Sequence, residues 1–361
     1  MNYSNLMINI LAGILLGAIL SPIATKVATK LHLIDDPRSS PRKIHNKPTP
    51  CAGGMVLIVG LGIAILMRFT GFDSDIIKII ASGSIVFITG LIDDHKSITV
   101  FQKFFGQFLA TTVMILLGIH VQIFEGSLLP VQLSATTALV LDIIITYVWV
   151  IGLSNAFNFI DSMDGLVVQL SQIAVVLMGI SAITYGQPSI ASLMIFLFGL
   201  LIAISVFNSY PATYFLGDSG SLFLGFILSA VSIILNPVDL PQASSWFFPI
   251  MFFTVPLFDM FLVVFSRIRH KVKFYKASTD HTYHRLCRLG LSSFRAIEVM
   301  KLESIFWSVV GMIAIYQTPL IANVLFVLFL INFIISFIYL DSSPKATNAN
   351  TNEERNIFYG P

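Results

Sequence analysis

The sequence predicts an all-α, polytopic bundle of membrane-spanning helices. Of its 361 residues, 56% are hydrophobic and only 11% are charged, whereas a soluble globular domain carries about 25% charged residues. The apolar residues gather in stretches of about 20, the length at which a helix spans the hydrocarbon core of a bilayer. Helices are favoured over strands because an open sheet leaves backbone groups without hydrogen bonds in lipid. The composition therefore excludes an ordinary soluble domain.

Eleven stretches have the length and composition of a membrane span. The first follows residues 1–5, which contain no Lys or Arg, so we interpret it as a retained helix and not a cleaved signal peptide. The fifth contains Asp142, and the last two are separated only by the turn at residues 317–319. In chain order the predicted spans are about 6–27, 53–69, 76–92, 101–119, 137–154, 166–184, 190–207, 220–236, 246–266, 302–316 and 319–340.

The basic residues predict the orientation of the bundle. If the N-terminus is outside, only Arg68 and Lys78 of the 21 Lys and Arg residues lie near outer ends of spans. Because basic residues collect on the cytosolic side of membrane proteins, we expect the N-terminus outside and the C-terminus in the cytosol. We expect one membrane domain over residues 1–341, and a polar tail over residues 342–361 with the composition of a disordered segment.

The motifs with chemical character all fall on the inner side. Acidic residues recur there at the ends of apolar stretches, where a carboxylate close to hydrocarbon is costly and therefore marks a functional site. In the first inner loop, Lys43 and His45 are donors suited to a polyphosphate, and Gly53 and Gly54 follow them. The basic charge of this loop would also suit binding to anionic lipid head groups.

The pair Asp93-Asp94 ends the third apolar stretch. Two adjacent carboxylates repel each other unless a cation lies between them, and an acidic residue at a helix C-terminus opposes the helix dipole. The alternative is a pair of solvated residues at a helix end. Lys103 and Gln107 follow two to three turns later and could face the same site, although a lysine at a helix end also snorkels towards water.

Polar residues recur every three positions after the fifth span. Asn155, Asn158 and Asp161 would share one face of a helical or turn-rich backbone, and Asp164 follows before Gly165. Their amide and carboxylate oxygens could bind Mg²⁺ or hold the edge of a uracil base. A plain polar loop is the alternative.

Two further strings lie in the later inner loops. Around Asp218, Gly217 and Gly220 let backbone N–H groups approach a ligand at the start of a helix, which is a ready anion site. A carboxylate there repels a phosphate unless a metal bridges them. In the next loop, His281 and His284 have the spacing of zinc ligands, but phosphate binding together with Arg285 or a plain basic surface also fits this string.

Taken together, these strings resemble the polyprenyl-phosphate N-acetylhexosamine-1-phosphate transferase superfamily, glycosyltransferase family 4. Within it the chain is most similar to the bacterial undecaprenyl-phosphate GlcNAc-1-phosphate transferases. It departs from that branch at Ser162 and Tyr283, where Gly and His are common. The motifs that carry the resemblance are Asp-x-Pro with Arg-Lys-x-His-x-x-Pro-x-Pro-x-x-Gly-Gly, Gly-Leu-Ile-Asp-Asp, Asn-x-x-Asn-Phe-Ile-Asp-x-Met-Asp-Gly-Leu, and Phe-Leu-Gly-Asp-x-Gly-Ser.

The resemblance implies a membrane bundle of eleven spans in the bacterial inner membrane, with its site facing the cytosol. It implies transfer of GlcNAc-1-phosphate from UDP-GlcNAc to undecaprenyl phosphate, with Mg²⁺ (or Mn²⁺) as cofactor and UMP as the leaving group. Another UDP-sugar is the alternative donor, and a transporter or a scaffold is the alternative from another class. The implied partners are the UDP-N-acetylhexosamine, the polyprenyl phosphate, membrane lipid and a second copy in a homodimer, with no nucleic acid.

The resemblance also implies roles for individual residues. The implied metal ligands are Asp218, Asn158, Asp93 and Asp94. The implied catalytic residues are Asp93, Asp94, Asp161, Asp164, His281, His284 and Arg285. The implied substrate-binding residues are Lys43, His45, Lys103, Asn155, Asn208 and Phe215, the last by stacking on the base.

Overall fold

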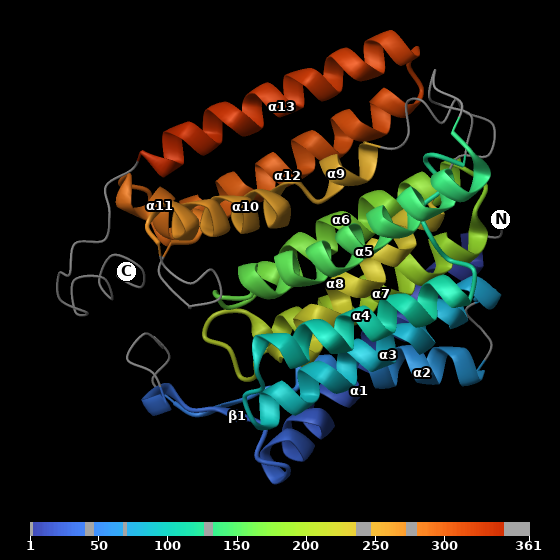
Figure 1. The fold of residues 1–361 in the computed structure, drawn as a ribbon. Coiled ribbons are helices and arrows are strands. Elements are labelled where there is room, and N and C mark those ends of the chain that lie inside the picture. The colour runs from blue at the N-terminus through green and yellow to red at the C-terminus, as the bar shows by residue number, and fades with distance from the viewer. Residues whose placement is uncertain are drawn as a thin grey trace. The chain divides into compact units, whose positions relative to one another are not determined.

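The described part of the chain forms helices and one pair of two-residue strands (Figure 1). The computed structural model describes residues 3–39, 47–67, 71–125, 133–235, 247–271 and 280–342. The residues divide into two compact units, which are described separately. The first comprises Met1–Asp36 and Pro48–Trp246, and the second comprises Pro37–Lys47 and Phe247–Pro361.

The first unit is organised around α8 (Gly217–Ile234), whose sides are almost entirely covered by protein. Helices α2, α3 and α5 contact α8 directly, while α7 packs against α1 and α6. Small residues allow this close packing, and the buried hydroxyl of Ser229 donates to the backbone oxygen of Phe226. The other helices of this unit are α1 (Tyr3–Lys30), α2 (Gly53–Met67), α3 (Ser74–His95), α4 (Val100–Leu116), α5 (Ala135–Ile160), α6 (Leu166–Thr184) and α7 (Pro188–Asn208).

A short hairpin holds the loop that precedes α8. Strands β1 (Ile34–Asp35) and β2 (Thr49–Pro50) pair antiparallel, with Ile34 opposite Pro50. The backbone N–H of Phe215 donates to the oxygen of Pro50 at 2.9 Å, and the oxygen of Phe215 accepts from the N–H of Ala52 at 3.0 Å. The segment that contains β2 and the loop before α8 are therefore fixed to each other through backbone hydrogen bonds.

The second unit contains five helices and the short 3-10 helix η1 (Pro37–Ser39) among its described residues. One of its cores gathers Phe247, Met251 and Trp307 around Phe329, and another joins Phe258 and Leu262 to Leu340. Its helices are α9 (Phe248–Phe252), α10 (Thr254–Arg269), α11 (Thr282–Arg288), α12 (Ser293–Ile315) and α13 (Pro319–Asp341).

The predicted apolar stretches all fall on helices, with differences at three of them. The stretch 246–266 is divided between α9 and α10, because Phe253 leaves the helical conformation and Pro256, which has no N–H to donate, is accommodated in the first turn of a new helix. Helix α12 begins earlier than predicted, at Ser293, where Ser292 caps it. Helix α5 continues to Ile160, beyond the predicted end of the fifth stretch, so Asn155 and Asn158 lie on its last turns.

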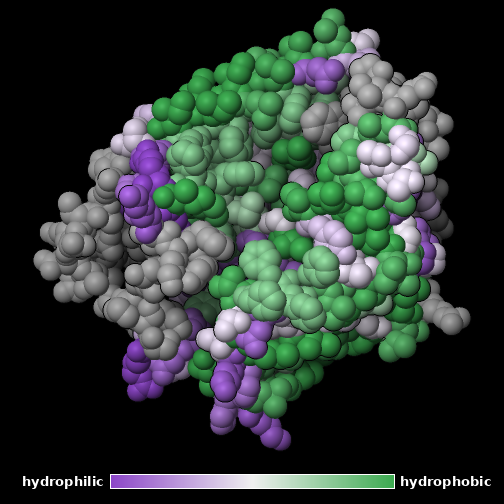
Figure 2. Space-filling model, in the orientation of Figure 1, coloured by the Kyte–Doolittle hydropathy of each residue, from purple (hydrophilic) through white to green (hydrophobic). Residues whose placement is uncertain are grey.

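The chain is a multi-pass membrane protein. Among the described residues, seven helices are long and apolar enough to cross a membrane, and α2 and α4 are shorter apolar helices. Figure 2 shows hydrophobic side chains along the helices of the visible face, with hydrophilic side chains gathered near helix ends. The count of eleven spans, their orientation and the single domain over residues 1–341 stay predictions. The predicted tail lies outside the described residues, apart from Ser342.

Candidate active site

The site in the first unit depends on a close approach between α3 and the start of α8. A Cβ atom at Gly90 would lie 2.5 Å from both the Cα and the N atoms of Ser219, which no side chain could tolerate. Glycine therefore lets the last turn of α3 reach the first turn of α8. The consequence is that Asp93 and Asp94, one turn further along α3, lie beside Asp218.

Asp94 caps the N-terminus of α8. Its carboxylate accepts hydrogen bonds from the backbone N–H of Asp218 at 2.8 Å, the N–H of Ser219 at 3.0 Å and the hydroxyl of Ser219 at 2.6 Å. Leu216, the residue before α8, has no side-chain group for this purpose. A carboxylate at this position satisfies otherwise unpaired N–H groups and matches the helix dipole. Asp94 thereby fixes the turn that carries Asp218.

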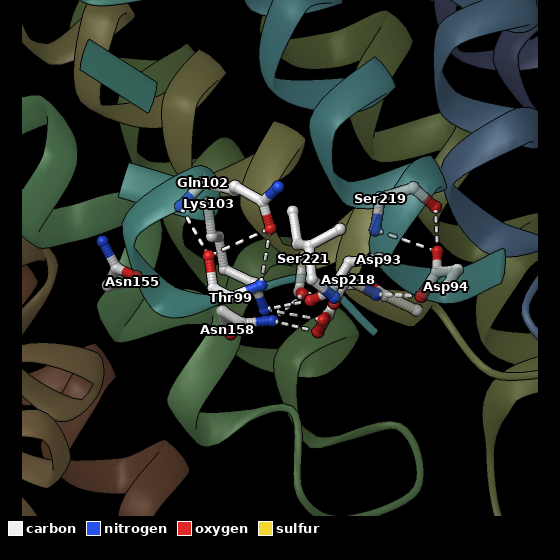
Figure 3. Close-up of polar contacts among 12 residues, drawn as sticks. Asp93, Asp94, Thr99, Gln102, Lys103, Asn155, Asn158, Asp218, Ser219 and Ser221 are labelled. Carbon is white, nitrogen blue, oxygen red and sulfur yellow. Dashed lines mark hydrogen bonds and ion pairs between the residues drawn. The ribbon is translucent and has the colours of Figure 1, made fainter. Parts of the chain in front are cut away.

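Asp93 and Asp218 share one cation, the ammonium group of Lys103. Lys103 forms an ion pair with Asp93 and another with Oδ2 of Asp218 at 2.7 Å (Figure 3). Asp93 also accepts the backbone N–H of Ile98 at 2.8 Å. The amide of Asn158 donates to Oδ1 of Asp218 at 2.6 Å. Four side chains from α3, α4, α5 and α8 thus form one polar cluster, which we call the Asp218 cluster.

Asn155 lies apart from the Asp218 cluster. Its side chain exchanges hydrogen bonds with the buried amide of Gln107, at 2.7 and 3.3 Å, and also donates to the backbone oxygen of Ile151. Figure 3 shows Asn155 separated from the residues around Asp218. Asn155 and Gln107 therefore join α4 to α5, whereas Asn158 reaches Asp218, and the predicted role of Asn155 in substrate binding stays a prediction.

Asp161 and Asp164 follow the end of α5. Burial raises the pKa of the Asp161 carboxyl well above its usual range, and the nearby carboxylates of Asp218, Asp94 and Asp164 add to this effect. Asp164 accepts the backbone N–H of Ala212 at 3.3 Å. Asp161 therefore belongs to the same acidic environment as Asp218, whereas Asp164 is tied to the loop before α8.

Asn208 and Phe215 also belong to that loop. The buried amide of Asn208 donates to the backbone oxygen of Tyr214 at 3.1 Å, and the hydroxyl group of Tyr214 is 3.0 Å from that of Ser21. Phe215 is half-buried and pairs with Cys51 through its backbone. Asn208 therefore holds the loop before α8 through its hydrogen bond to Tyr214, and Phe215 lies in that loop.

The predicted residues of the second unit form a centre of their own. Asp259 is fully buried and accepts hydrogen bonds from Nδ1 of His281 at 2.8 Å and from the backbone N–H of Thr282 at 2.6 Å. His284 is also buried, and this burial, with the neighbouring His281 and Arg288, lowers the pKa of its imidazole well below the usual value. His281 is therefore held in one orientation, and His284 is neutral near pH 7.

Arg285 holds the end of α13. Its Nη1 donates to the backbone oxygen of Leu340 at 3.0 Å and to Oδ1 of Asp341 at 3.3 Å, and its Nε donates to the backbone oxygen of Asp280 at 2.9 Å. These contacts satisfy carbonyl groups at a helix C-terminus. Arg285 thus has a structural role in the second unit, and its predicted catalytic role stays a prediction. Lys43 and His45 lie outside the described residues.

The donor set around Asp218 suits Mg²⁺. Two carboxylates, Asp93 and Asp218, point at one shared cation, and an amide and a hydroxyl, from Asn158 and Ser221, lie alongside. Oxygen ligands of this kind are those that Mg²⁺ takes, usually with only one or two carboxylates. Within the described ranges, no group of three or more His, Cys, Asp or Glu side chains is arranged for a metal.

The segment that carries the Asp218 cluster is similar to known proteins. Residues 76–236 match the model of glycosyl transferase family 4. This match confirms the predicted family resemblance. It covers every member of the Asp218 cluster, whereas the centre at His281 lies beyond it.

Three curated relatives illustrate the range of the similarity. A probable undecaprenyl-phosphate N-acetylglucosaminyl 1-phosphate transferase of Bacillus subtilis is 28% identical over 76% of this chain and 75% of its own length. An undecaprenyl-phosphate alpha-N-acetylglucosaminyl 1-phosphate transferase of Yersinia pestis is 26% identical over 84% and 82%. A phospho-N-acetylmuramoyl-pentapeptide-transferase of Staphylococcus haemolyticus is 29% identical over 72% and 81%.

Sequence reasoning found the acidic members of the site but missed the residues that assemble them. Gly90 was quoted only as part of a motif, although its place one turn before the Asp pair on an apolar helix signals a close approach. The capping role of Asp94 was also missed, because its partners at Ser219 are more than a hundred residues away in the chain. No pattern in the sequence paired Gln107 with Asn155.

Proposed function

We propose that this protein transfers a sugar 1-phosphate from a UDP-N-acetylhexosamine to a polyprenyl phosphate and releases UMP. The observation that carries this proposal is the convergence of Asp93, Lys103, Asn158 and Asp218 at the start of α8, within the segment that matches glycosyl transferase family 4. Relatives named for transfer of N-acetylglucosaminyl 1-phosphate to undecaprenyl phosphate support GlcNAc as the sugar.

The reaction exchanges one phosphate–oxygen bond for another. A phosphate oxygen of the lipid attacks the β-phosphorus of the donor, a new bond forms to that oxygen, and the bond to the bridging oxygen of UMP breaks. Because the second pKa of a phosphate is about 6, the lipid phosphate is already a nucleophile at neutral pH and needs little help from a base. The work of the protein is mainly to position the two phosphates and to balance their charge.

The residues of the Asp218 cluster would divide this work. Asp218, with Asn158 and Asp93, would hold Mg²⁺, which supplies positive charge at the diphosphate when it is bound. Lys103 is the cationic donor of the cluster and would hold a donor phosphate. Asp94 keeps the first turn of α8 in place through its three hydrogen bonds and so acts on the reaction through Asp218.

The nucleoside would lie near the loop before α8. Asp161, Asp164, Asn208 and Phe215 are assigned to it, with Phe215 stacking on the base. Lys43, His45, His281 and His284 are assigned to phosphate and sugar groups on the strength of the family resemblance. The buried carboxylate of Asp259 fixes the ring of His281 and so keeps Nε2 available to a ligand.

The membrane arrangement is part of the proposal. Eleven spans, with the N-terminus outside and the C-terminus in the cytosol, would place these motifs at the cytosolic face of a bacterial inner membrane. There UDP-sugars are supplied from water and the lipid phosphate from the bilayer. A homodimer is proposed by family resemblance alone.

A UDP-sugar other than UDP-GlcNAc is the alternative donor. Tyr283, in the loop where the GlcNAc branch commonly carries histidine, is buried and lies with its ring centroid 3.9 Å from that of His284. Replacement of a histidine in this ring cluster favours testing N-acetylgalactosamine, deoxy and diamino sugars, and the muramoyl pentapeptide, beside GlcNAc. A transporter is less well supported, because the acidic cluster gathers at helix ends and the buried Asp142 is fully engaged by backbone groups.

A radiolabel assay tests the proposal. Purified protein would be incubated with undecaprenyl phosphate, Mg²⁺ and each UDP-sugar, and UMP release would be measured together with label in the lipid phase. We expect both signals with UDP-GlcNAc. Transfer from a different sugar would keep the reaction and change the donor, and absence of UMP with every donor from folded protein would contradict the proposed function.

A further inference from the structure

Lys103 occupies the place where a metal would be expected. Its ammonium group contacts Asp93 and Oδ2 of Asp218 together, and its side chain is only 19% exposed. One side chain of the protein itself therefore pairs with both carboxylates and balances one of their two negative charges. Figure 3 shows Lys103 reaching down from α4 to this pair.

The two carboxylates, and not the helix that carries Lys103, hold its ammonium group in place. Helix α4 begins with a capping box, in which Thr99 accepts the N–H of Gln102 at 3.3 Å and Gln102 accepts the N–H of Thr99 at 2.9 Å. This box fixes the backbone of the first turn. A cation in the first turn of a helix opposes the helix dipole, so the ion pairs with Asp93 and Asp218 must hold it there.

A divalent cation and this ammonium group compete for the same carboxylate oxygen atoms. Oδ2 of Asp218 is 2.7 Å from Nζ of Lys103, and a metal bound to that oxygen would bring two positive centres into contact. Their repulsion is strong at this separation when the surroundings are partly desolvated. Lysine has a flexible four-carbon stem, so its ammonium group can leave while the backbone of α4 stays in place.

We propose that Lys103 is the resident counter-ion of Asp93 and Asp218, and that Mg²⁺ binds by displacing it. The exchange turns a lysine that is occupied by two carboxylates into a free cationic donor beside the metal. This inference rests on the proposed function for its consequence, because the freed ammonium group is then available to the diphosphate of a UDP-sugar. The exchange itself concerns only the protein and the cation.

Metal binding without substrate tests the exchange. Mn²⁺, the paramagnetic substitute for Mg²⁺, would be titrated into purified protein while the free-ion signal is followed by electron paramagnetic resonance. Lys103→Met removes the competing cation and is expected to lower the Kd for Mn²⁺ about tenfold, which corresponds to about 1.4 kcal/mol. Lys103→Arg keeps the charge and is expected to bind Mn²⁺ no more tightly than the unmodified protein.

Lys96 supplies the matched control. It lies at the end of α3, close to the Asp pair in sequence, but its side chain is exposed. Lys96→Met loses the same charge and is expected to leave the Kd unchanged. Adding Asp218→Asn to Lys103→Met should abolish the gain. An unchanged or weaker Mn²⁺ affinity in Lys103→Met, or an equal gain in Lys96→Met, would overturn the proposal.

A second measurement uses the unmodified protein and so does not depend on how a variant folds. Amines would be methylated reductively, and the modification of Lys103 would be quantified by mass spectrometry with and without Mg²⁺. Displacement predicts that Mg²⁺ increases modification of Lys103 and leaves that of Lys96 unchanged. A decrease or no change at Lys103 would contradict displacement. Both experiments omit the UDP-sugar, so failure of the transfer assay alone would leave the exchange intact and refute only the proposed function.

Discussion

Two carboxylates within membrane-spanning helices of the first unit, Asp142 and Asp218, are stabilised in different ways. Asp142 in α5 accepts hydrogen bonds from the backbone N–H groups of Ile123, Phe124 and Glu125, at 3.0 to 3.1 Å. Asp218 in α8 accepts instead from the side chains of Lys103 and Asn158. Backbone donors are fixed by the fold, whereas side chains can rotate away, so only Asp218 can exchange its partners for a ligand.

This contrast separates a structural carboxylate from a functional one. A buried charge in a membrane helix is a candidate for function by default, and by that rule alone both residues would be candidates. The identity of the donors distinguishes them. Asp142 closes the segment at residues 121–125 onto α5, with Thr146 accepting the N–H of Val121 at 2.9 Å beside it.

The largest expected effect is the loss of transfer activity when Asp218 is replaced. Asp218→Asn is expected to keep the protein folded and inserted and to lower transfer by about two to three orders of magnitude, because a neutral amide cannot replace the carboxylate that would hold Mg²⁺ at the diphosphate. UMP release measured against Mg²⁺ concentration checks this. Activity close to that of the unmodified protein would remove Asp218 from the metal assignment.

Replacement of Asp142 should lower stability and leave transfer activity nearly unchanged. Asp142→Asn presents an amide N–H₂ group to backbone donors, and we expect a loss of about 1–3 kcal/mol in stability, since buried groups lose their hydrogen bonds. Transfer per folded molecule should change little. Thermal unfolding measures the first quantity and UMP release the second.

Glu125→Gln is the control for Asp142. Glu125 pairs with His120 at 3.1 Å, and its side chain is 36% exposed. Such an exposed pair contributes little, so its loss is expected to cost less than about 1 kcal/mol. If Asp142→Asn lowered transfer without lowering stability, the distinction between the two carboxylates would be wrong.

Asp94 lies between these two cases. It holds backbone N–H groups, as Asp142 does, but those groups carry Asp218. Asp94→Asn is expected to lower the free energy of unfolding by about 1 kcal/mol, because it weakens the helix cap. The transfer rate of the folded protein should also fall, because the turn that presents Asp218 is loosened. Ser219→Ala removes one of the three hydrogen bonds to Asp94 and should have the smaller effect on both. Equal transfer rates for the two variants would contradict this order.

The sequence predicted the helices and the family resemblance because both depend on local patterns. Apolar length predicts a span, and a carboxylate at its end predicts a site. What it could not predict are the relations between distant helices. Asn155 and Asn158 share a three-residue spacing, yet the first pairs with Gln107 and only the second reaches Asp218. The spacing is local information, whereas the partner depends on which helix packs against each position.

Arg285 illustrates the same limit in the second unit. Its place beside two histidines suggested a phosphate ligand, while its contacts at Leu340 and Asp341 lie more than fifty residues further along the chain. Similarly, Phe253 separates α9 from α10 within a stretch whose apolar composition is continuous. Composition reports that a segment is apolar but does not report where its backbone turns.

The smallest expected effect concerns the end of the chain. Deletion of residues 343–361 keeps the acceptors of Arg285 on α13. It is expected to leave thermal stability unchanged and transfer within about twofold, because a mostly polar terminus has few apolar residues to bury. Deletion from residue 339 onwards removes those acceptors and leaves the buried guanidinium group without them, which should cost about 1–3 kcal/mol. The two truncations, compared by thermal unfolding and UMP release, separate the tail from the last turn of α13. Loss of transfer in the shorter deletion would mean that the tail belongs to the site.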